Sequence, residues 1–123
     1  LIYKLIIPGQ LPGNNEYIAA NRTNRYAGAA LKKKAQEEIE WCIKRQLRGV
    51  RPKTPLSMSY TFYESNKKRD HDNVASFAMK VVQDALVESG TLKNDGWAEI
   101  ERISLAWGVD KENPRVEITL EEI

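Results

Sequence analysis

The chain has 123 residues, of which 41% are hydrophobic and 29% charged, a composition that fits one folded domain and excludes an intrinsically disordered segment. No apolar run approaches the ~18 residues that a membrane-spanning helix needs, and no signal-peptide pattern is present. Cys42 is the only cysteine, so no internal disulfide can form, which suits a reducing compartment. We therefore expect a single domain over residues 1–123, located in the cytoplasm, with no membrane partner.

The charge is unevenly distributed along the chain, although its net value is only +2. Residues 1–69 carry 14 Lys and Arg against 5 Asp and Glu, whereas residues 70–123 carry 5 against 12. A basic half can attract a polyanion such as DNA, and a carboxylate-rich half can hold a cation. The alternative is an ordinary solvated surface without either role.

The first half of the chain predicts one strand, one long loop and one helix. The apolar, β-branched residues 1–7 indicate a strand that ends at Pro8. Residues 8–28 are rich in Gly, Pro and Asn and predict a long connection, of the kind that is often functional or mobile. Residues 29–48 predict a helix that Gly49 ends. Its apolar stripe consists of Leu31, Ala35, Ile39, Cys42, Ile43 and Leu47.

The second half predicts three strands and a second helix. Residues 56–64 alternate as a strand does, with Leu56, Met58, Tyr60 and Phe62 on one face. A helix from about Asn73 to Ser89 ends at Gly90, and residues 99–109 and 115–123 indicate two further strands. The buried face of this second helix is predicted to contain Val74, Phe77, Ala78, Val81, Val82 and Ala85. The order predicts an α/β (α+β) fold, a mixed four-stranded sheet with two main helices packed on it.

The stretch KKRDHDNVASF, residues 67–77, changes abruptly from basic to acidic. If it is extended, Asp70 and Asp72 point to the same side and His71 to the opposite side. Two carboxylates so close repel each other unless a cation lies between them. Their hard oxygens suit Mg²⁺ or Mn²⁺, whereas a lone histidine does not support a zinc site. The alternative is that Asp72 only caps the second helix.

Two residues further along add to this hypothesis. Asp95 lies in the turn after the second helix, and a return connection could place it beside the first two aspartates. Lys80 shares a polar stripe of that helix with Asn73 and Asp84, where it could offset carboxylate charge or contact a phosphate. The pattern alone favours a surface ion pair between Lys80 and Asp84, which would stabilise the helix by roughly 0.3 kcal/mol.

The stretch RDHDN, then Lys80, then DALVESGTLKNDGW resembles the RusA-like Holliday junction resolvases, small endodeoxyribonucleases common in phages and prophages. PGNNEYIAANR is similar to that family's Asn-rich segment after its first strand, so the resemblance covers about residues 8 to 97. Two features depart from the family's founding member. Its lysine follows the aspartate pair about one helical turn sooner, and two aspartates stand where this chain has Asn94 and Asp95.

The resemblance implies a single RusA-like endonuclease domain that binds branched DNA as a homodimer and nicks four-way junctions symmetrically, with Mg²⁺ or Mn²⁺ as cofactor. Asp70, Asp72 and Asp95 match the family's metal-binding catalytic aspartates, and Lys80 matches a lysine important for activity. The DNA backbone would be contacted by the basic residues, which are Arg22, Arg25, Lys32, Lys33, Lys34, Lys67, Lys68 and Arg69. The alternatives are a non-catalytic DNA-binding recombination protein, and a metal nuclease acting on other branched or duplex DNA.

Overall fold

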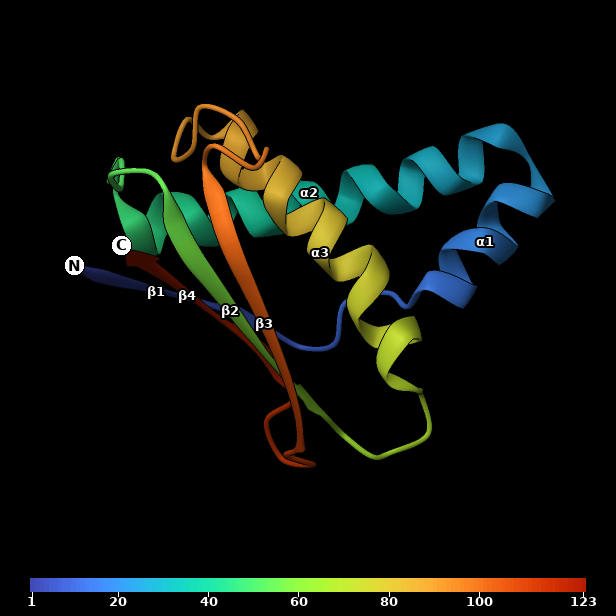
Figure 1. Ribbon diagram of the computed structural model, residues 1–123. Helices are drawn as coiled ribbons and strands as arrows, with labels where there is room; N and C mark the ends of the chain where they lie inside the picture. The colour runs from blue at the N-terminus through green and yellow to red at the C-terminus, as the bar shows by residue number, and fades with distance from the viewer.

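The computed structural model describes residues 1–123 and contains four strands and three helices (Figure 1). In chain order these are β1 (Ile2–Pro8), α1 (Asn14–Thr23), α2 (Arg25–Leu47), β2 (Leu56–Glu64), α3 (His71–Glu88), β3 (Ile100–Val109) and β4 (Arg115–Glu122). The strand predicted at residues 56–64 is confirmed with its bounds. The α+β fold is also confirmed.

The sheet is mixed, with strand order β1-β4-β2-β3. Strand β4 pairs antiparallel with both β1 and β2, whereas β3 pairs parallel with β2 and forms one edge. All three helices lie on the same side of the sheet in Figure 1. The two chain ends meet, because Glu122 N–H donates to the Leu1 carbonyl at 3.0 Å.

The core lies between this sheet and the helices, where the predicted apolar faces meet. All the predicted inward side chains of β2 are at most 1% exposed, and the predicted buried arc of α3 is also buried. The stripe of α2 is buried except for Leu31, which is half-exposed. Period-2 and period-3.6 patterns therefore located the core correctly, because each element buries one face only.

The prediction of a long loop over residues 8–28 is wrong, because this stretch forms α1 and the start of α2. Asn24 separates the two helices, and its side-chain oxygen accepts from the backbone N–H groups of Tyr26 and Ala27, as an N-cap does. The glycines serve close packing here. A Cβ on Gly28 would lie 1.7 Å from Asn21 Oδ1, so α1 and α2 approach each other where Gly28 has no side chain.

Helix α1 has no fully buried residue, so contacts with other helices, rather than a buried face of its own, hold it in place. The ring of Tyr17 packs against Phe77 of α3 at 5.0 Å between centroids. Asn73 of α3 accepts from the backbone N–H of Asn15 at 2.8 Å. These tertiary contacts override the loop-like composition, so a third, shorter helix packs on the two main helices predicted.

None of the three helices combines the length and the apolar character that crossing a membrane would require.

Candidate active site at the start of the third helix

Asp70 and Asp72 do not share one extended segment, because only Asp70 has extended backbone, whereas Asp72 lies in the first turn of α3. Asp70 is the N-cap residue, and its Oδ1 accepts from the Asn73 backbone N–H at 2.9 Å. The helix therefore begins at His71, two residues earlier than predicted. Asp72 follows inside the helix, where its Oδ1 accepts from the Ser76 hydroxyl at 2.9 Å. The capping role considered for Asp72 is taken by Asp70.

The three candidate aspartates share one electrostatic property. Of the five aspartates in the chain, Asp84 and Asp110 form ion pairs, whereas no Lys or Arg nitrogen lies within 4.0 Å of Asp70, Asp72 or Asp95. The positive end of the α3 dipole stabilises the first two where they stand. Both are exposed, and hard oxygens of this kind fit Mg²⁺, which takes one or two protein carboxylates beside waters and substrate phosphate.

Asp95 does not join them within one chain. It lies in the loop after α3, in a hollow shared with Lys80, Asp84 and Asn94. Because a helix rises 1.5 Å per residue, Lys80 stands about 12 Å along the axis from Asp72. No group of three or more His, Cys, Asp or Glu side chains is close enough to hold one ion. The convergence expected from a return connection is thus not found in the single chain.

Lys80 forms the ion pair with Asp84 that the helical spacing predicted, at 3.1 Å. Lys32 of α2 reaches the other oxygen of the same carboxylate at 2.9 Å. Burial acts to raise the pKa of Asp84, but the hydrogen bonds from Lys32 and Lys80 outweigh it and leave that pKa lowered. The bond to Asp84 raises the pKa of Lys80. The Lys80 side chain is 65% exposed, so its ammonium remains a charge that solvent and a phosphate can reach.

The predicted DNA-binding cations fall into two groups. Lys32 and Arg69 are engaged with carboxylates of the protein. The remaining cations are exposed and form no ion pair. These are Arg22, Arg25, Lys33, Lys34, Lys67 and Lys68. Lys67 and Lys68 lie in the loop that leads directly into α3, whereas the other four stand on α1 and on the first half of α2.

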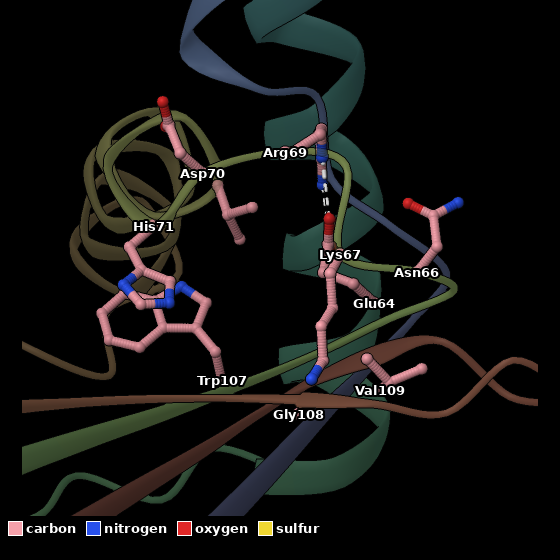
Figure 2. Close-up of a pocket in the computed structure, with 10 residues that line it drawn as sticks. Glu64, Asn66, Lys67, Arg69, Asp70, His71, Trp107, Gly108 and Val109 are labelled. Carbon is pink, nitrogen blue, oxygen red and sulfur yellow. Dashed lines mark hydrogen bonds and ion pairs between the residues drawn. The ribbon is translucent and has the colours of Figure 1, made fainter.

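Arg69 is a structural residue in this fold (Figure 2). Its Nε and Nη2 donate to the two carboxylate oxygens of Glu64, each at 2.8 Å, and its Nη1 donates to the Leu11 carbonyl at 3.0 Å. Glu64 is 8% exposed, which makes this a largely buried bidentate pair. Through it the end of β2 and the segment before α1 hold the loop that leads to Asp70.

A cavity of about 400 Å³ opens beside Asp70, between the start of α3 and the end of β3 (Figure 2). Its lining includes Lys67, His71 and Trp107, and the His71 ring lies over the Trp107 ring. The sequence reasoning assigned no role to these two rings. Alternation along β3 is the signal that could have found Trp107, since it pairs with the inward-facing Phe62.

Two hard carboxylates at the start of α3, preceded by the exposed cations Lys67 and Lys68, can hold a divalent ion beside a bound phosphate backbone. The model of the family described as endodeoxyribonuclease RusA matches residues 8–121 of the 123-residue chain. The chain therefore belongs to the RusA family of endodeoxyribonucleases, which act on Holliday junctions. This confirms the resemblance and extends it over the last two strands. A search of curated proteins gave no match.

Proposed function

We propose that this chain resolves four-way DNA junctions as a homodimer, by paired symmetric nicks that require Mg²⁺ or, in its place, Mn²⁺. The observation that carries the proposal is the match of the family model to residues 8–121, together with three aspartates that have no ion-pair partner. A four-way junction has two-fold symmetry, so paired nicks call for two equivalent active sites on a symmetric dimer. We place the activity in recombination and repair, in the cytoplasm, in a protein of phage or prophage origin.

The metal site in this proposal is shared between two chains. Asp70 and Asp72 of one chain supply two ligands, and Asp95 of a second copy supplies the third. Support comes from the position of Asp95, which lies in the hollow with Lys80 and forms no three-carboxylate group with the first two in the single chain. A bound Mg²⁺ would polarise the scissile phosphate and lower the pKa of a coordinated water.

The side chains of the protein have two tasks around that site. The free cations on α1, α2 and the loop before α3 hold the DNA backbone, so binding weakens steeply as salt rises. Lys80 adds positive charge where the phosphate becomes more negative in the transition state. Its exposed ammonium, held by Asp84 rather than buried in the core, supports this role.

The test is incubation of an end-labelled four-way junction with the protein in Mg²⁺, in Mn²⁺ and in EDTA, beside a linear duplex of the same sequence. We expect symmetric nicks in the junction with either metal, none in EDTA and none in the duplex. Binding of the junction without nicking would favour the non-catalytic DNA-binding alternative. Equal cleavage of the duplex, or of a flap, would favour a metal nuclease with another substrate.

Lys80→Ala is expected to lower the nicking rate by on the order of a hundredfold, while junction affinity changes far less. Lys32→Ala is the matched control, because Lys32 pairs with the same carboxylate as Lys80. Single-turnover nicking and gel-shift titration measure rate and affinity separately. Similar rates in the two variants would reduce Lys80 to a surface partner of Asp84.

A further inference from the structure

An aromatic stack leads from the core to the surface beside the candidate active site. The rings of Tyr60 and Phe62 are nearly parallel, with centroids 5.9 Å apart. Phe62 and Trp107 follow at 6.1 Å, and Trp107 and His71 at 4.1 Å with 22° between their planes. The inner members are buried, Trp107 is half-buried and His71 is exposed. His71 is thus a rigidly supported outer ring, because the rings beneath it cannot move freely.

The cavity that His71 and Trp107 line is suited to a ligand with an aromatic ring and polar edges. Its wall includes the Asn66 amide and the Lys67 side chain, which extends across it in Figure 2. Trp107 Nε1 is buried and has no hydrogen-bond partner, which is costly for an indole N–H. Asp70 lines the same cavity, so its occupant lies next to the carboxylates of the proposed metal site.

We propose that this cavity receives one unpaired base of the DNA substrate, stacked against His71, so that the adjoining phosphate is positioned at Asp70 and Asp72. This inference rests on the proposed function, since a branch point is where such a base becomes available. The aromatic face suits any base, because every base has a π-face. Lys67 supplies the positive charge that a nucleotide needs and an uncharged aromatic ligand does not. Asn66 can hydrogen-bond a base edge.

The experiment measures binding in EDTA, so that no nicking takes part. Fluorescence anisotropy gives the affinity for a labelled oligothymidylate and for an abasic oligomer of equal length, which has the same phosphates without bases. We expect the wild-type chain to bind the thymidylate roughly fivefold or more tightly than the abasic oligomer. His71→Ala should abolish this preference, whereas His71→Phe, which keeps an aromatic ring, should retain most of it. Affinity for the abasic oligomer should be the same in all three proteins.

Trp41→Ala is the control, because Trp41 is an exposed tryptophan of α2 that lies outside this cavity. It should keep the wild-type preference. Wild-type protein without a preference for bases, or His71→Ala with the wild-type preference, would overturn the inference. Since the assay contains neither metal nor junction, its result is independent of nicking. Junction nicking without base preference would therefore reject this inference alone, and base preference without nicking would reject the proposed function alone.

Discussion

Asp70→Asn and Asp72→Asn are each expected to reduce junction nicking in Mg²⁺ by on the order of a hundredfold or more, to the point where no product is detected. Junction binding should survive or become tighter, because each change removes a negative charge from beside the DNA phosphates. Asparagine suits this test at position 70. It caps a helix as well as aspartate does, so the bond from the Asn73 N–H is retained. Any loss of activity then reports the lost charge.

The controls for this prediction separate charge from folding. Glu37→Gln removes a charge from an exposed position of α2 and should leave nicking unchanged. Asp70→Ala loses both the charge and the cap, at a cost of about 1 kcal/mol of helix stability. It should nick no better than Asp70→Asn but unfold at a lower temperature. Full activity in Asp70→Asn or Asp72→Asn would remove that residue from the active site.

The same stretch shows how far sequence reasoning reached. The core positions of β2, α2 and α3 were predictable because apolar residues recur at the period of each element. The start of α3 was not, because a capping aspartate and a metal-binding aspartate look alike in sequence. Asp70 is held by a local hydrogen bond to Asn73, which favours the helix two residues earlier. The assumption of an extended segment from Asp70 to Asp72 therefore does not hold, because Asp72 already lies in the helix.

Other features depended on contacts between distant segments. Helix α1 forms from a Gly-, Pro- and Asn-rich stretch because Tyr17 and Asn15 contact α3. Nothing in the local pattern reports those partners. The position of Asp95 is a similar case, since a turn after a helix can return in several directions. The resemblance to the family predicted that the three aspartates and Lys80 form one active site. In the fold of one chain, Asp95 does not form a common metal-binding group with the other two aspartates.

Arg69→Met is expected to lower the free energy of unfolding by about 3 kcal/mol, at the lower end for buried pairs. The Arg69 side chain keeps 23% exposure and that of Glu64 10%, so solvent screens the pair in part. The variant leaves the Glu64 carboxylate without its two charged hydrogen bonds and the Leu11 carbonyl without a donor. Thermal unfolding should show a decrease in Tm of about 10 °C. A shift within experimental error would make this pair an ordinary surface contact.

The double variant Glu64→Gln/Arg69→Met tests the physical reason and the DNA-binding prediction together. When both charges are removed, no unpaired charge stays buried, so the double variant should be more stable than Arg69→Met alone. That recovered stability allows junction binding to be compared in a folded protein. If Arg69 serves only to hold the loop before Asp70, the double variant binds the junction as tightly as wild type. If Arg69 also contacts phosphate, the double variant binds the junction more weakly than wild type. The slope of its binding constant against salt concentration then decreases by about one charge.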